Sequence, residues 1–235
     1  MAIWLWLLVC TGLPARAAEA PAEPATETAW NELTSQYTLL HMTQRYPEAS
    51  QVAERALAVA EQVFGREDAR VAQTLNDLGD LWQLQGQPAR AIPLHQRALA
   101  IREHVPSSDP ASLVQSLSNL ANAQQAEGRY ADARPLFERA IALVERHAGP
   151  THPQVATLLS ELAEGHYREG HVAEAEPLFK QALEIQEKTL GAFHPDLVVV
   201  LERYAAFLRE TGREKEARAL EGRAAAIRSE RPTQK

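Results

Sequence analysis

The sequence predicts an all-α fold, a right-handed α-solenoid of about five antiparallel helix pairs with a degenerate first pair. Glycines recur at one constant interval, at Gly86, Gly128, Gly170 and Gly212. Alanines follow five and twelve residues after each of these glycines. Apolar residues spaced three and four apart precede the glycines, which places them on one helical face. A fixed period of this length is typical of a stacked repeat architecture.

The first copy of the repeat has lost its glycine. Counting back from Gly86 by the same interval gives Gln44, whereas the two alanines persist as Ala49 and Ala56. Five copies are enough for a stable stack, because one helix pair cannot bury its apolar face alone and three or more are needed. We place the copies at residues 27–67, 68–109, 110–151, 152–193 and 194–229.

Each copy contains two predicted helices, A and B. In the second copy Leu75, Leu78 and Trp82 share one face of helix A. Gly86 then ends this helix, because glycine tolerates the left-handed conformation that a helix C-cap requires. Helix B follows after a tight turn, and its recurring alanines predict places where two helices approach too closely for a larger side chain.

The N-terminal residues differ from the repeats. Residues 3–9 are an apolar run, and Ala15-Arg16-Ala17 fits the A-x-A cleavage pattern of a secretory signal peptide. We predict a signal peptide at residues 1–17, a flexible linker at 18–26, a tail at 230–235, and export, in a bacterium to the periplasm. The alternatives are an uncleaved anchor, although the run is shorter than the roughly 20 residues of a membrane span, and a lipid on Cys10, although Val9 is not the small residue that usually precedes a lipidated cysteine.

The composition favours a folded protein that binds other proteins. Apolar residues make up 45% of the chain and charged residues 23%, which is ordinary for a soluble globular domain. The net charge is −7 and the pI about 5.7. Nucleic-acid binding is disfavoured because it usually requires a basic patch or a high pI. A basic or polar segment of a protein partner suits this charge better.

The connections between copies also repeat. GPTHPQVATLL at residues 149–159 matches GAFHPDLVVVL at residues 191–201. Together with the glycine and alanine positions, this pattern resembles the 42-residue tetratricopeptide repeats of the kinesin light chain type, over residues 27–229 and best over residues 152–187. The resemblance implies that the A helices line a concave surface and that the protein is a scaffold for protein–protein interaction.

The resemblance also implies which side chains face a bound peptide. The corresponding positions of helices A are Asn76, Asp80, Gln83, Ser118, Asn122, Gln125, Ser160, Glu164, Tyr167, Glu202 and Arg209. An asparagine amide can donate to and accept from a peptide backbone. Three acids among these positions favour a partner segment with Lys or Arg, with Tyr167 packed on it. The alternative is that these residues form only solvated helix faces.

The chemically reactive side chains favour structural roles. His166 and His171, with Glu161 and Glu164 nearby, are a conceivable metal site, but His166 occupies the place that Trp82 has in an earlier copy. We therefore expect packing and no metal or cofactor. His152 and His194 precede prolines at the starts of helices and are expected to cap or pack there.

These features predict an exported scaffold that binds a peptide or a helical surface of another protein. The sequence contains no G-x-S-x-G, P-loop or H-E-x-x-H motif, and we expect no catalytic activity. Two other functions stay open. One is an accessory or regulatory subunit of an envelope enzyme or assembly machine, and the other is a structural subunit that self-assembles.

Overall fold

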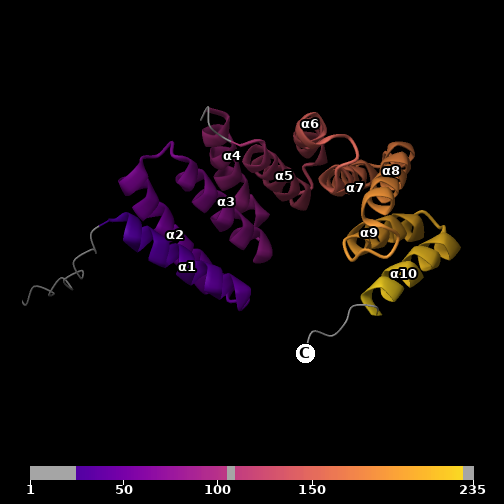
Figure 1. The fold of residues 1–235 in the computed structure, drawn as a ribbon, viewed down its shortest axis with the longest axis horizontal. Coiled ribbons are helices and arrows are strands. Elements are labelled where there is room, and N and C mark those ends of the chain that lie inside the picture. Colours follow the sequence, from indigo (N-terminus) through magenta and orange to yellow (C-terminus); the bar gives the residue numbers. More distant parts are fainter. Residues whose placement is uncertain (1–24, 105–108, 230–235) are drawn as a thin grey trace, which may run out of the picture.

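The computed structural model describes residues 25–104 and 109–229, which form ten α-helices packed as consecutive antiparallel pairs (Figure 1). The helices are α1 Glu27–Met42, α2 Tyr46–Phe64, α3 Ala69–Leu84, α4 Pro88–His104, α5 Pro110–Ala126, α6 Tyr130–Ala148, α7 Pro153–Arg168, α8 Val172–Leu190, α9 Leu197–Glu210 and α10 Glu214–Ser229. The predicted all-helical solenoid is therefore confirmed.

The predicted signal peptide, the tail and all of the linker before Ala25 lie outside the described residues. Among the helices that the structure does describe, none combines the length and the apolar character that crossing a membrane requires.

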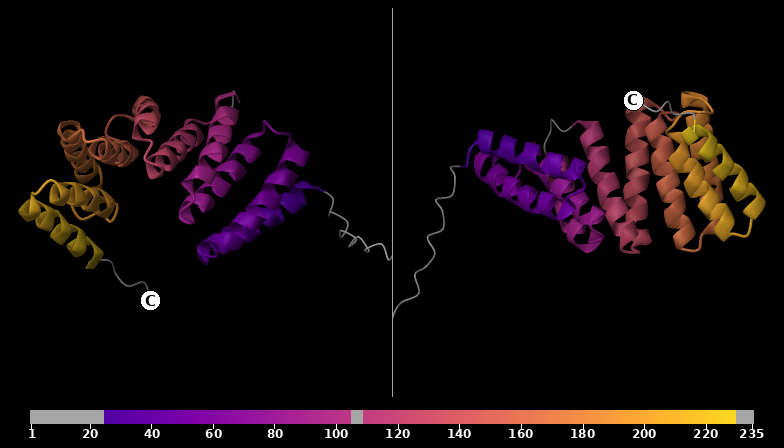
Figure 2. Two further views of the ribbon diagram at one scale, coloured as in Figure 1. Left: turned by 180° about the vertical axis from the view of Figure 1, so that it is seen from behind. Right: turned by 90° about the horizontal axis from the view of Figure 1, so that it is seen from below.

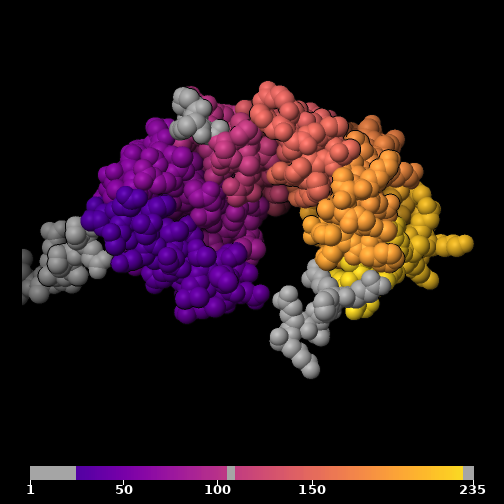
Figure 3. Space-filling view, in the orientation of Figure 1, coloured from indigo at the N-terminus to yellow at the C-terminus, as the bar shows by residue number. Residues whose placement is uncertain are grey.

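The ten helices form an arch with a concave inner side. The odd-numbered helices, A in each copy, lie along the inside, and the even-numbered helices lie outside them (Figures 1 and 2). Neighbouring A helices touch across the repeats, because α3 contacts α5, α5 contacts α7 and α7 contacts α9. The space-filling view shows the inner side as a hollow between the two ends of the arch (Figure 3). Side chains on the odd-numbered helices therefore decide what this hollow can bind.

The recurring glycines end the A helices as expected. Gly86, Gly128, Gly170 and Gly212 have φ between +70° and +87°. At the third of these turns the backbone N–H of His171 donates to the carbonyl of His166 at 2.9 Å, which is the long bond of a Schellman motif. In the first copy Gln44 takes the same role at φ +58°. A residue with a Cβ is strained in this region.

The strain at Gln44 gives a stability prediction. Gln44→Gly is expected to raise the free energy of unfolding by about 0.5–1 kcal/mol, because glycine adopts the left-handed conformation without a steric penalty. Urea unfolding followed by circular dichroism measures this. A lower unfolding midpoint than that of the wild type would contradict the prediction.

Side-chain caps begin several A helices. Asp68 accepts a hydrogen bond from the backbone N–H of Arg70 at 2.9 Å, as is common for aspartate at a helix N-terminus. His152 acts in the same way at the start of α7, because its Nδ1 accepts from the backbone N–H of Gln154 at 3.3 Å. His194 lies two residues before Asp196, the N-cap of α9, and its Nδ1 accepts from the Asp196 backbone N–H at 3.3 Å within the preceding turn. The predicted capping role is confirmed for His152, whereas His194 bonds the turn that precedes α9 and does not cap the helix.

Helices A and B of one copy meet at a pair of positions whose sizes are complementary. The pairs occupy equivalent positions of successive copies and are Tyr37/Ala53, Gly79/His95, Ala121/Phe137 and Ala163/Phe179. All eight residues are buried. In the second copy the His95 ring lies so close that a Cβ built on Gly79 would be 2.4 Å from it. A small residue on one helix thus makes room for a ring on the other, as close packing requires.

Candidate functional site

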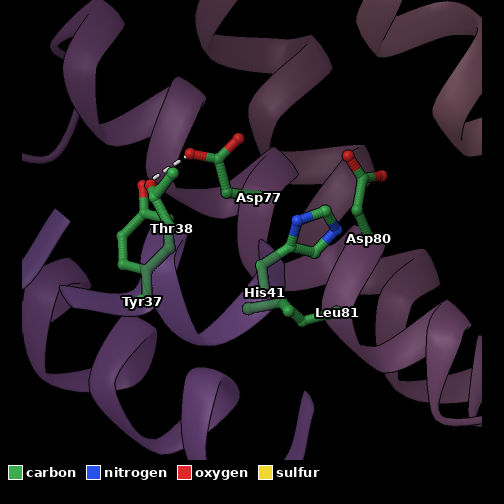
Figure 4. Close-up of a pocket in the computed structure, with 6 residues that line it drawn as sticks. All are labelled: Tyr37, Thr38, His41, Asp77, Asp80 and Leu81. Atoms are coloured by element: carbon green, nitrogen blue, oxygen red, sulfur yellow. Dashed lines mark hydrogen bonds between the residues drawn. The ribbon is translucent and has the colours of Figure 1, made fainter. Parts of the chain in front are cut away.

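The concave side has a cavity of about 220 Å³ between α1 and α3. Its lining comes from two helices of neighbouring copies: Tyr37, Thr38 and His41 of α1, and Asp77, Asp80 and Leu81 of α3 (Figure 4). Two carboxylates, an imidazole and a phenol therefore share one small space with the apolar side chain of Leu81.

Asp77 is held in place by neutral donors. The Tyr37 hydroxyl donates to its Oδ2 at 2.6 Å (Figure 4). Gln73 Nε2 donates to its Oδ1 at 2.7 Å. Burial raises the pKa of Asp77 above its usual range, although these two hydrogen bonds act in the opposite direction. The carboxylate is therefore positioned by hydrogen bonds without being neutralised by them.

Asp80, the second cavity carboxylate, also has a raised pKa, which favours its neutral form. Asn119 Nδ2 of α5 donates to its Oδ1 at 2.8 Å. Burial, followed by the negative charge of Asp77, raises the pKa of Asp80 to about 7. The side chain is nevertheless 41% exposed, so a ligand in the hollow can reach it. A cation placed here would relieve an unfavourable negative charge.

His95 does not neutralise Asp80, although its Nε2 lies 3.7 Å from Asp80 Oδ1. Burial lowers the pKa of His95 to about 4, which leaves the ring neutral at pH 7. The hydrogen bonds of its two ring nitrogens fit one neutral tautomer. Nδ1 donates to Asn76 Oδ1 at 3.2 Å, and Nε2 accepts from Gln83 Nε2 at 3.0 Å.

A buried polar network joins α3, α4 and α5 beside the cavity. Asn76 Nδ2 donates to Ser116 Oγ at 2.9 Å. Arg102 of α4 donates to the same Oγ at 2.8 Å and to Gln73 Oε1 at 2.7 Å. Its guanidinium is thus bound by neutral oxygens. Within residues 25–104 and 109–229, no lysine or arginine forms an ion pair with either cavity carboxylate.

The acids further along the hollow differ from Asp77 and Asp80 because they form ion pairs with arginines. Arg203 of α9 lies 3.5 Å from Glu161 and 3.9 Å from Glu164. Arg168 pairs with Glu210 at 3.4 Å. A smaller cavity of about 70 Å³ lies between α7 and α9, with Glu164 and Arg203 in its lining. These acids in the C-terminal half of the inner side are therefore paired with arginines, whereas Asp77 and Asp80 in the N-terminal half are not paired with any described arginine.

All but two of the predicted groove residues fall into three groups. Asp80 lines the first cavity, and Glu164 and Tyr167 line the second. Four others are half-buried. Three of them form hydrogen bonds within the protein, namely Gln83 to His95, Gln125 to the Glu161 carbonyl and Ser118 to the Val114 carbonyl. The fourth is Asn122 on α5. Glu202 and Arg209 pair with residues of α10, Arg228 and Glu221.

Asn76 and Ser160 are corrections to the sequence prediction. Both side chains are fully buried, so neither can contact a ligand in the hollow. The reason is their place on the flank of helix A that meets the next A helix. Asn76 bonds Ser116 of α5, and Ser160 Oγ accepts from Arg203 of α9 at 3.2 Å.

The sequence reasoning missed Tyr37, Thr38, His41 and Asp77. Thr38 and His41 stand one repeat period before Asp80 and Gln83, so extending the period into the degenerate copy would have found them. Asp77 belongs to a polar column with the same period, Asp77, Asn119, Glu161 and Arg203. Within this column Asn119 bonds Asp80 of the preceding copy, and Arg203 pairs with Glu161.

A tetratricopeptide repeat family model matches residues 38–104, 112–188 and 155–230. The chain belongs to the tetratricopeptide repeat family, whose members are scaffolds for protein–protein interaction. No curated protein sequence matches it.

Solved structures support the same fold. A Podosopora anserina protein assigned to the kinesin light chain type, with nearly identical TPR-like repeats, is 27% identical with a TM-score of 0.69, and the match covers 88% of this chain and all of the other. BtubC (BKLC) from P. vanneervenii is 23% identical with a TM-score of 0.64, covering 82% and 75%. The Rap conjugation gene regulator of plasmid pLS20, in complex with the Phr* peptide, is 14% identical with a TM-score of 0.66, covering 92% and 60%.

Proposed function

We propose that the concave side binds an extended segment of a partner protein and that an arginine or lysine of this segment enters the cavity between α1 and α3. One observation carries the proposal. Asp77 and Asp80 share this cavity without an ion pair to any described lysine or arginine, whereas Glu161, Glu164 and Glu210 are paired with arginines. The protein acts by binding and does not itself turn over a substrate.

The cavity suits a long basic side chain better than a small cation. Its apolar wall, Leu81, can cover the methylene stem, and the two carboxylates can accept from the charged end. A guanidinium offers five N–H donors and binds carboxylates with good geometry. The raised pKa of Asp80 implies that its charge is unfavourable until such a cation arrives.

A bound peptide in another protein of the same fold supports a peptide as the ligand. The Rap regulator that shares this fold was solved with a bound peptide. The tetratricopeptide family in general provides surfaces for protein partners. An extended segment could lie along α1, α3 and α5, because these helices are neighbours on the inside of the arch (Figure 1).

A peptide selection tests this proposal. Random peptides displayed on phage would be selected on the purified protein and counter-selected on the Asp77→Asn/Asp80→Asn variant. Arginine or lysine should be enriched at one fixed position of the recovered peptides. Recovered peptides without a basic residue, or with equal affinity for both proteins, would contradict the proposal.

The cavity also predicts how binding depends on pH. Asp80 has a pKa of about 7, so it is mostly neutral at pH 6 and mostly charged at pH 8. Affinity for an arginine peptide should therefore be about tenfold higher at pH 8 than at pH 6. The groups around Asp80 are Asp77, the neutral His95, the buried Arg102 and His41. Fluorescence anisotropy at several pH values measures this pH dependence, and an affinity that is constant or higher in acid would contradict it.

We also propose that the protein works after export. The support is the apolar run at residues 3–9 followed by Ala15-Arg16-Ala17. Mass spectrometry of the protein isolated from its source cells should show a chain that begins at Ala18. A chain that retains residues 1–17 would contradict cleavage. A lipid-modified Cys10 would show that the protein is anchored to a membrane instead.

A further inference from the structure

His166, Glu169 and His171 form a cluster at the turn between α7 and α8, apart from the concave cavities described above. Each offers one possible ligand atom, and these atoms all lie within 4.8 Å of one another. The two imidazole rings are 5.9 Å apart between centroids. His166 Nδ1 is buried and has no hydrogen-bond partner within the described part of the chain. The cluster therefore contains a nitrogen lone pair or N–H that the fold leaves unused.

The turn itself fixes the spacing of these three residues. Gly170, at φ +87°, reverses the chain between Glu169 and His171. The backbone N–H of His171 donates to the His166 carbonyl at 2.9 Å and closes the turn. Two histidines five residues apart are thereby brought together on one side of it. The backbone holds the cluster before any ligand arrives.

The sequence favours packing and no metal at these two histidines, and the structure changes this expectation. Glu161 and Glu164 were expected near the two histidines, but both lie beside Arg203 on the inner side of the arch. Glu169 takes their place, with Oε2 3.6 Å from His171 Nδ1. Two imidazoles and one carboxylate are a donor set that suits Zn²⁺ and related divalent transition ions.

We propose that His166, Glu169 and His171 bind one Zn²⁺ ion or a similar divalent transition-metal ion. Bonds of about 2.0–2.2 Å to a tetrahedral zinc put ligand atoms roughly 3.4 Å apart, so the ligand atoms need to approach one another by up to about 1.4 Å. His171 is 46% exposed, which gives the ion a route in and leaves room for water as the fourth ligand.

Arg134 of α6 is the main competitor for this ion. Its Nη2 donates to both oxygens of Glu169, at 2.8 and 3.1 Å. This guanidinium weakens metal binding in two ways, because it occupies the carboxylate and repels a second cation. Removing its charge should therefore strengthen binding, whereas removing a ligand should weaken it. Opposite effects from neighbouring substitutions distinguish a metal site from adventitious surface binding.

The test is a titration of ZnCl₂ into the chelator-treated, full-length protein, followed by calorimetry. We expect one ion per chain, and the visible absorption of Co²⁺ should report nitrogen and oxygen ligands. His171→Ala and Glu169→Gln should each weaken binding at least about tenfold. Arg134→Gln should tighten it. His194→Ala is the matched control, because His194 is another turn histidine beside an acid, 3.7 Å from Asp196, and should leave binding unchanged.

Three results would overturn the proposal. They are no saturable binding of Zn²⁺, the same affinity in His171→Ala as in the wild type, and weaker binding in Arg134→Gln. His171 is an exposed turn residue, so its substitution leaves the fold intact, and circular dichroism would verify this.

Discussion

Replacing both cavity carboxylates, as Asp77→Asn with Asp80→Asn, is expected to weaken the binding of an arginine peptide at least about 100-fold. Each carboxylate would accept a charge-assisted hydrogen bond from the guanidinium, and such bonds contribute about 1.5–3 kcal/mol. An amide keeps the shape of the side chain but offers no charge. Calorimetric titration at pH 8 measures the loss. Asp132→Asn is the control, because Asp132 is an exposed acid of α6 that is paired with Arg129, and this substitution should leave the affinity unchanged.

Asp80→Asn alone is expected to stabilise the free protein. Asp80 binds its proton more tightly in the folded state, with a pKa of about 7 against a normal 3.8. Between these two pH values the folded state holds more protons than the unfolded state, so the free energy of unfolding falls as the pH rises. The substitution removes this loss. Because the side chain is 41% exposed, solvent screening reduces the gain to about 1 kcal/mol at pH 8.

Lower affinity together with higher stability would identify Asp80 as a binding residue that the fold does not need. A structural residue would lose stability when replaced. Urea unfolding at pH 5 and pH 8 separates the two roles, because the stabilising effect should be smaller at pH 5. A variant that is less stable than the wild type at pH 8 would contradict this account of the cavity.

Gly79→Ala is expected to destabilise the protein, although alanine favours a helix more than glycine does. The new methyl group would lie 2.4 Å from the His95 ring. That ring is fully buried and hydrogen-bonded at both nitrogens, so it cannot simply turn away. Overpacking of this kind costs about 1–3 kcal/mol, and the helix propensity of alanine offsets up to about 1 kcal/mol. The expected net loss in the free energy of unfolding is therefore about 1–2 kcal/mol.

A double-mutant cycle tests the cause of this effect. His95→Ala removes the ring, and in that background Gly79→Ala should no longer be destabilising. Urea unfolding of the four proteins gives the coupling energy directly. If Gly79→Ala costs the same with and without the ring, the close contact between these two residues is not the reason.

The constant repeat spacing predicted the helix pairs because glycines and small residues mark where helices end and meet. The resemblance to the kinesin light chain repeats identified Asp80, Glu164 and Tyr167 at the surface of the hollow. It failed for Asn76 because one residue turns a helix by about 100°, so a position can move from the open face to the flank between helices. The second copy also has a histidine where the third has Phe137, and this ring engages the Asn76 amide.

The state of each acid could not be predicted from the spacing. Asp77 and Asp80 stay unpaired because Arg102 is bound to Ser116 and Gln73, whereas Glu161 is paired because Arg203 reaches it from the next copy. Which arginine reaches which carboxylate depends on packing between helices that belong to different copies of the repeat. Export, the absence of catalysis and the partner remain predictions from the sequence and the fold.

The most direct test of the proposed binding mode is a comparison of two peptides that differ at one residue. A selected peptide with arginine at its fixed basic position, and the same peptide with citrulline there, would be titrated into the protein at pH 8. Citrulline has nearly the shape of arginine but no charge. We predict at least about tenfold weaker binding of the citrulline peptide, and the same weak affinity of both peptides for the Asp77→Asn/Asp80→Asn variant. Equal binding of the two peptides by the wild-type protein would show that the cavity between α1 and α3 does not recognise a basic side chain.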